Sequence, residues 1–196
     1  MQNKYLKGGL SALAAAAMLA TGSARARTTD VSYTYRCPAG YPGDINRAHP
    51  FSVEPVMQNA TTPCTLHGEA IIIDTATNSG RKVAAGDTAL TRIYGIVARE
   101  FPAQQTQSMQ ATIGVGAPPT NQPLSAMREG YVMVRCNGTP TKDGAVYLWI
   151  AASTGNHVQG TFETAATGGS TIQVTNAKFN GPGDSAGCAE LILWMS

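Results

Sequence analysis

The sequence predicts an all-β protein: a sandwich or barrel of about eight to nine short strands, with an N-terminal arm. Charged residues make up only 13% of the chain while Gly (21) and Pro (11) are plentiful, which is typical of short strands joined by tight turns. From residue 52 onward, short apolar or alternating runs are separated by turn residues. After residue 30 no stretch has the spacing of an amphipathic helix, and the intervals between runs are too short for the crossover helices of a βαβ fold.

The expected strands follow one another at near-regular spacing, as in a sandwich or barrel. The run 145–153 alternates clearly, with Val146 and Leu148 facing one side and Tyr147 and Trp149 the other. The predicted strands are 52–57, 69–75, 91–99, 110–115, 130–137, 145–153, 158–163, 171–179 and 188–195. The turns expected between them are 78–80, 85–87, 118–119, 142–144, 167–169 and 181–183.

The net charge of +2 is unevenly distributed along the chain. Residues 1–36 hold five basic residues and one acidic residue, whereas the remaining 160 residues hold nine basic and eleven acidic ones. A body so close to neutral lacks the basic surface that nucleic-acid binding requires, so we expect no direct nucleic-acid partner. We predict a division into an N-terminal arm or signal-peptide-like segment, 1–36, and a β-rich domain, 37–196.

The N-terminal segment has two interpretations. Lys4 and Lys7 precede an apolar run over 8–20, and Ala24-Arg25-Ala26 has the form of a cleavage site, as in a secretory signal peptide. Alternatively, the Ala-rich stretch 12–20 forms a short helix in an uncleaved arm. The run is too short for an ordinary transmembrane span, so we expect no membrane association.

The four cysteines are far apart in the sequence, and none forms a C-x-x-C pair. In an exported protein they would form two disulfides in one of three pairings. In a reducing cytosol they would be small buried hydrophobic residues. The positions are Cys37, Cys64, Cys136 and Cys188.

One motif suggests catalysis, because residues 183–187 satisfy G-x-S-x-G around Ser185. An α/β-hydrolase needs a histidine after this serine, and none follows in the eleven residues that remain. A trypsin-like arrangement would need several strands after the nucleophile, and only one is expected. We therefore interpret the motif as a turn between two strands.

No other pattern indicates an enzyme, a cofactor or a metal. The three histidines, His49, His67 and His157, lie in unlike contexts and are expected to be solvated or satisfied by neighbours. The carboxylates are scattered, with no pair spaced as in a glycosidase. Gly114-Val115-Gly116 runs into two prolines and cannot begin a phosphate-binding helix.

The order of several segments resembles the tailed-bacteriophage structural cement proteins, also described as capsid decoration proteins. The resemblance covers about residues 38–195 and depends on order and spacing, since no single motif is diagnostic. The segments that carry it are 40–47 (GYPGDINR) with 53–56, 68–74 with its AIIID run, 85–88 with 93–102 (IYGIVAREFP), 116–119 with 128–134 (REGYVMV), 144–148, and 179–183 (FNGPG).

This resemblance implies a small jelly-roll or β-barrel-like domain in a non-enzymatic protein on the outer surface of a phage capsid, assembled in the host cytoplasm. The resemblance also implies that it bridges neighbouring subunits of the major capsid protein and forms a homotrimer. Many modest contacts repeated by symmetry would then raise the cost of opening the shell. Residues 1–36 have no counterpart in the family pattern, and the four cysteines are unusual for it.

The predicted capsid-contact residues lie in the segment that links arm and body. A rigid Tyr-Pro-Gly turn with flanking charges suggests Tyr41, Pro42, Asp44 and Arg47. The alternative function is a secreted or periplasmic disulfide-bonded β-domain that binds carbohydrate or a cell surface. It predicts a mature N-terminus at Arg27 and paired cysteines.

Overall fold

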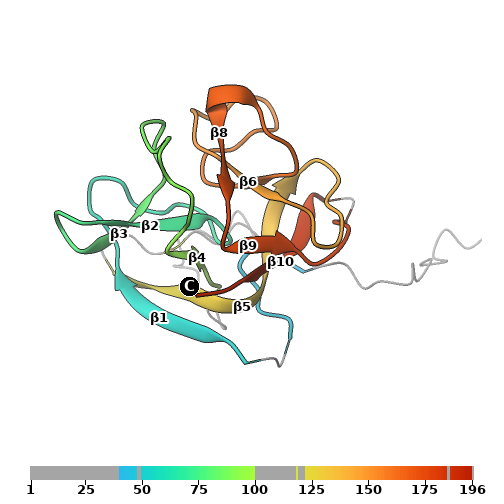
Figure 1. Cartoon of the computed structure of the whole chain (residues 1–196). Helices are drawn as coiled ribbons and strands as arrows, with labels where there is room; N and C mark the ends of the chain where they lie inside the picture. Colours follow the sequence, from blue (N-terminus) through green and yellow to red (C-terminus); the bar gives the residue numbers. More distant parts are fainter. Residues whose placement is uncertain (1–39, 48–49, 100–117, 119–121, 185, 196) are drawn as a thin grey trace, which may run out of the picture. The chain divides into compact units, whose positions relative to one another are not determined.

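The computed structural model describes residues 40–47, 50–99, 118, 122–184 and 186–195, and their regular secondary structure is almost entirely β-strand (Figure 1). The all-β prediction is confirmed. Among the described residues no helix has the length and apolar character needed to cross a membrane. The strands are β1 (Ser52–Met57), β2 (Ala70–Asp74), β3 (Ser79–Lys82), β4 (Gly95–Val97), β5 (Pro123–Asn137), β6 (Val146–Trp149), β7 (Phe162–Glu163), β8 (Thr171–Val174), β9 (Ala177–Phe179) and β10 (Cys188–Leu193), with a 3₁₀ turn, η2 (Gly168–Ser170).

The 15-residue strand β5 organises the sheet, because it pairs with different partners along its length. Its first half pairs antiparallel with β1 on one side and β4 on the other, and its second half pairs with β10. At its end Cys136 and Asn137 pair in parallel with β7. The change occurs at Gly130, whose φ of 119° favours glycine, and Figure 1 shows β5 changing direction between its two parts.

The remaining strands extend the sheet from these contacts in the order β3-β2-β4-β5-β7-β6-β8, with β9 added to β10. One large core cluster runs from β2 to β10 and includes Leu148, Phe162, Phe179 and Leu191. Strand β2 is buried on both faces, since Ile72 belongs to this cluster and Ile71 to a second, smaller one. That double burial explains why β2 is a continuous apolar run instead of an alternating one.

Most predicted strands are present, several with different bounds. The range 52–57 matches β1, and 69–75 and 188–195 exceed β2 and β10 by one or two residues. The predicted 91–99, 145–153 and 158–163 are longer than β4, β6 and β7, whereas 130–137 is only the second half of β5. The predicted strand 110–115 lies outside the described residues.

Two predictions about strands and turns are wrong. The predicted strand 171–179 is two strands, β8 and β9, separated by Thr175 and Asn176, whose side chains bond to the backbone of another segment. The predicted turn 78–80 overlaps β3, because only Asn78 has a turn conformation (φ 52°) and the strand begins at Ser79. Gly80 is part of this strand, and a Cβ there would be 2.8 Å from Cγ1 of Val56, so the close packing at this position favours glycine.

Other predicted turns are confirmed by backbone hydrogen bonds. The amide of Asp87 donates to the carbonyl of Ala84 (3.0 Å), and the amide of Gly144 donates to the carbonyl of Thr141 (3.0 Å). The amide of Ser170 donates to the carbonyl of Thr167 (3.0 Å), closing the η2 turn. These turns set the register of the strands that they join.

Candidate interaction surface

The segment 40–47, here called the linking segment, is pinned to the body by backbone hydrogen bonds. The amide of Gly43 donates to the carbonyl of Met133 in β5 (2.7 Å), and the amide of Met133 donates to the carbonyl of Asp44 (2.9 Å). The amide of Arg99, just after β4, donates to the carbonyl of Gly43 (2.8 Å). Gly43 is buried with φ 90°, and a Cβ there would lie 2.9 Å from Cβ of His67. The segment therefore sits in one fixed position beside β5.

Tyr41 is the most exposed large hydrophobic side chain among the described residues, at 63%. Its turn is closed twice, since the amide of Asp44 donates to the carbonyl of Tyr41 and Oδ2 of Asp44 accepts from the amide of Tyr41, both at 3.0 Å. The guanidinium of Arg99 lies 5.2 Å from the centre of the Tyr41 ring, within cation–π range. Pro42, which follows Tyr41 in this turn, is half-buried. The ring is thus presented to solvent from a rigid turn.

Arg47 is committed to contacts within the chain. Its Nε and Nη2 donate to the two carboxylate oxygens of Glu190, each at 2.7 Å, and its guanidinium lies 4.8 Å from the centre of the Tyr131 ring. The hydrogen bonds to Glu190 raise the pKa of Arg47. The four predicted contact residues therefore all lie in the linking segment. The ring of Tyr41 is exposed to solvent, and Arg47 bonds the segment to Glu190 of β10.

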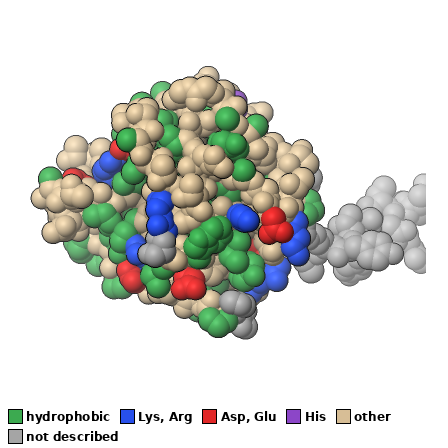
Figure 2. All heavy atoms as spheres, viewed as in Figure 1, with side chains coloured by type: hydrophobic (Ala, Val, Ile, Leu, Met, Phe, Trp, Pro, Cys, Tyr) green, Lys and Arg blue, Asp and Glu red, His purple; other side chains and the backbone are tan. Residues whose placement is uncertain are grey.

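Sequence reasoning missed three other exposed hydrophobic side chains, namely Phe51 (54% exposed), Met57 (55%) and Met195 (47%). Within β1 a signal existed for Met57, which follows buried Val56 and so faces the opposite side. Phe51 and Met195 lie just outside strands, where no periodicity applies. Figure 2 shows hydrophobic side chains among charged ones over β1 and β5, and few charged side chains over β6 and β8.

The G-x-S-x-G motif forms a turn in the described residues around Ser185, which itself lies outside them. Oδ1 of Asp184 accepts from the amides of Ala186 (2.9 Å) and Cys188 (2.8 Å), and the amide of Asp184 donates to the carbonyl of Cys188 (2.8 Å). Asp184 therefore shapes the entry into β10, as the turn interpretation predicts.

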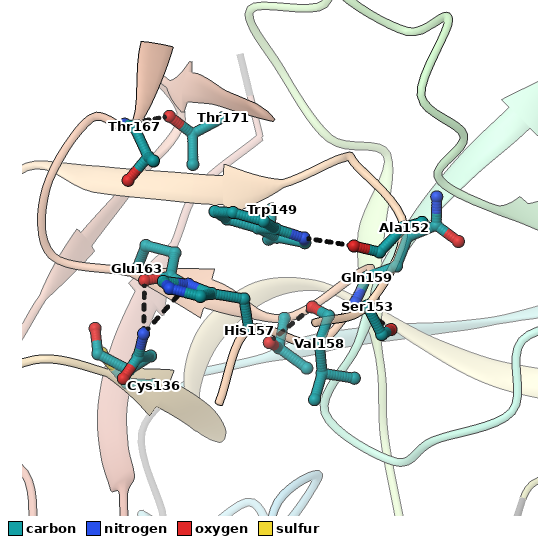
Figure 3. A network of polar contacts seen from close by, with 12 residues as sticks. Cys136, Trp149, Ala152, Ser153, His157, Val158, Gln159, Glu163, Thr167 and Thr171 are labelled. Atoms are coloured by element: carbon teal, nitrogen blue, oxygen red, sulfur yellow. Dashed lines mark hydrogen bonds and ion pairs between the residues drawn. The ribbon is translucent and has the colours of Figure 1, made fainter. Parts of the chain in front are cut away.

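His157 belongs to a closed polar network between β5, β6 and β7 (Figure 3). Its Nδ1 lies 2.9 Å from Oε1 of Glu163, and Nδ2 of Asn137 donates to Oε2 of the same carboxylate (3.0 Å). The imidazole stacks on Trp149, with ring centres 4.2 Å apart. The neighbouring hydroxyl of Thr161 donates to a backbone carbonyl (2.8 Å). This arrangement holds the 150–160 loop in place, and His157 is satisfied by its neighbours as predicted.

The thiols of Cys64, Cys136 and Cys188 are buried and free, and none of the three forms the disulfides that the export hypothesis requires. Burial raises the pKa of all three, to about 12 for Cys136. Since the thiolate is the reactive form, these thiols are inert at neutral pH. Cys37 lies outside the described residues, as does His49. Within the described residues no three His, Cys, Asp or Glu side chains gather in a set that could hold a metal ion.

Comparisons with known proteins point to one kind of assembly. A model of the family described as "XM1 gp53 minor capsid protein" matches residues 31–193. A solved structure, "The capsid of Myoviridae Phage XM1", contains a chain with a TM-score of 0.60 and 18% identity, covering 81% of this chain and 92% of that chain. At this identity the structural likeness shows the fold alone. No curated protein matches.

Proposed function

Because the chain belongs to the XM1 gp53 minor capsid protein family and is thus a structural component of a phage capsid, we propose that it cements the capsid. In this role it is a non-enzymatic protein that binds the outer surface of the shell and bridges neighbouring subunits of the major capsid protein. The family match confirms the resemblance to phage capsid proteins. A phage capsid protein is part of the virion, which favours this location over the secreted alternative.

The observation that carries the cementing role is the rigid presentation of Tyr41. Tyrosine gives a large contact area at low entropic cost, and a turn closed by Asp44 and pinned to β5 is ordered before it binds. Such preorganisation lets even a small contact contribute affinity. In the sequence, the linking segment comes shortly after residues 1–36. For these residues we propose the role of an arm that binds a neighbouring subunit.

Bridging requires that one molecule contact two capsid subunits at once. The body and the arm would supply two such contacts, and a homotrimer would multiply them around a symmetry axis. Each contact is modest, but linked contacts reinforce one another through effective concentration. The near-neutral charge beyond residue 36 suits protein partners in the shell better than DNA.

The test uses phage heads produced without this protein, to which the purified full chain is added back. We expect saturable binding, a higher temperature of head rupture than for bare heads, and a trimer in solution by light scattering. Tyr41→Ala should weaken binding about ten-fold, as expected for truncation of a central aromatic contact. Met57→Ala, a similarly exposed apolar side chain at the end of β1, is the matched control.

Three results would count against the proposal or a part of it. Failure of the full chain to bind heads would remove the cementing role altogether. Binding with no change in rupture temperature would leave a decoration protein that does not reinforce the shell. If Tyr41→Ala binds like the unaltered chain, the linking segment is not the contact.

A further inference from the structure

A second surface, distinct from the linking segment, is a pocket of ≈ 320 Å³ at the end of β10. Ile72 and Ile73 of β2 line it, together with Trp194 and Met195 from the residues that follow β10. Met195 is 47% exposed at this site. The strand leading to this pocket ends near the point marked C in Figure 1.

The backbone that frames the pocket is held rigidly by Asn176, from the turn between β8 and β9. Its side chain accepts from the amide of Ile93 (3.2 Å) and donates to the carbonyl of Ile93 (3.0 Å). The amide and hydroxyl of Thr175 both donate to the carbonyl of Thr91, at 2.8 and 2.9 Å. The amide of Trp194 donates to the carbonyl of Asn176 (3.2 Å). A pocket fixed in this way binds without the cost of ordering its own walls.

The charged side chains that line the pocket are arginines, Arg92 and Arg128, and no carboxylate lines it. Arg128 is partly neutralised, since its Nε lies 3.7 Å from Oε2 of Glu54 and its guanidinium lies 3.6 Å from the centre of the Tyr94 ring. Arg92 is exposed, and none of the ion pairs formed among the described residues includes it. The pocket therefore offers the exposed apolar side chain of Met195 beside an uncompensated positive charge.

We propose that this pocket docks a segment of a neighbouring capsid protein that carries an Asp or Glu next to a large apolar side chain. The carboxylate pairs with Arg92, and the apolar side chain packs against Met195 and the other apolar residues that line the pocket. The inference rests on the proposed capsid role and gives the body its own contact, separate from Tyr41. A nucleic-acid strand fits less well, because one uncompensated arginine beside isoleucines cannot neutralise a run of phosphates.

The first test measures binding of the full chain to heads made without it. Arg92→Glu should lower the affinity at least about ten-fold, because it places like charges together at the contact. Arg92→Lys should retain binding within a few-fold, since it keeps the charge. Lys142→Glu makes the same charge change in the exposed turn between β5 and β6 and should bind normally. Arg92 is exposed, so unchanged thermal midpoints are expected for all three variants.

The second test identifies the occupant by replacing Met195 with a photo-reactive benzoylphenylalanine in assembled particles. We expect a cross-link to a peptide of another virion protein that contains Asp or Glu. Cross-links to DNA, to a second copy of this chain, or to nothing in particles that hold the protein would overturn the inference. If the unaltered chain does not bind heads, the proposed function fails too. If it binds and Arg92→Glu binds equally, only this inference fails.

Discussion

At the scale of single residues, two positions show how backbone and charge are constrained by their surroundings. Gly43 occupies a conformation with φ 90° between β5 and the residues after β4, so the linking segment depends on the absence of a side chain there. Glu69 is fully buried, and its Oε1 accepts hydrogen bonds from the amides of Thr65 and Leu66 while Oε2 lies 4.0 Å from Nζ of Lys82. Each position leads to a measurable expectation.

Gly43→Ala should destabilise the domain by about 1–3 kcal/mol, because alanine combines an unfavourable φ with close contacts to His67 and Arg99. The measurement is the free energy of unfolding from urea titration. Gly86→Ala is the matched control, since a Cβ there meets nothing within 4 Å. Equal stability of the two variants would contradict the rigid attachment of the linking segment.

Because the carboxyl of Glu69 is buried, we expect the free energy of unfolding to depend on pH. Burial raises its pKa, against the opposing effects of the Leu66 amide and of Lys82. A raised pKa in the folded state means that its stabilising contribution is complete below the unfolded pKa, about 4.3, and is lost as the pH rises through the folded value. The difference in unfolding free energy between the unaltered chain and Glu69→Gln should therefore fall as the pH rises from 4 to 8. A difference that stays constant would show that Glu69 does not titrate in this way.

At the scale of elements, the break between β8 and β9 is caused by side chains that replace ladder hydrogen bonds. Asn176 is buried and satisfies both backbone groups of Ile93, which is itself buried. The segment 91–94 consequently meets its hydrogen-bonding needs without forming a strand, and β4 begins only at Gly95. One asparagine thus delays the start of one predicted strand and divides another.

Asn176→Ala should destabilise the domain by about 2–4 kcal/mol, because it leaves a buried amide and a buried carbonyl without partners. Urea unfolding measures this loss. Asn156→Ala, at an exposed loop position, should change the stability by no more than about 0.5 kcal/mol. Hydrogen exchange at the amide of Ile93 offers a local readout, and unchanged protection in Asn176→Ala would contradict the role given to this side chain.

At the scale of the whole molecule, stability comes from a core that strands from both ends of the described chain share. Strand β5 joins the β1–β4 and β6–β10 regions, and the largest buried cluster contains residues of both. The three described thiols lie within this packed structure, not in cross-links.

The buried thiols give a test of the packing as a whole. In the native protein Cys64, Cys136 and Cys188 should react slowly with iodoacetamide, and in urea all three should react fully, as peptide mass spectrometry would show. Dithiothreitol should leave the thermal midpoint unchanged, because no disulfide joins these residues. Equal labelling of native and unfolded protein would contradict the buried positions.

The sequence by itself determined the all-β class, the bounds of β1, the turns at 85–87, 142–144 and 167–169, and the likeness to phage capsid proteins. These follow from alternation, from glycine and proline at turns, and from segment order, all of which are local or sequential properties. Tertiary structure alone decided that Asn176 bonds to Ile93, that Gly130 lets β5 change partners, and that Arg92, Trp194 and Met195 meet at one pocket. The reason is physical: periodicity reports which face of a strand is buried, but not which distant group satisfies a backbone hydrogen bond or lies across a pocket.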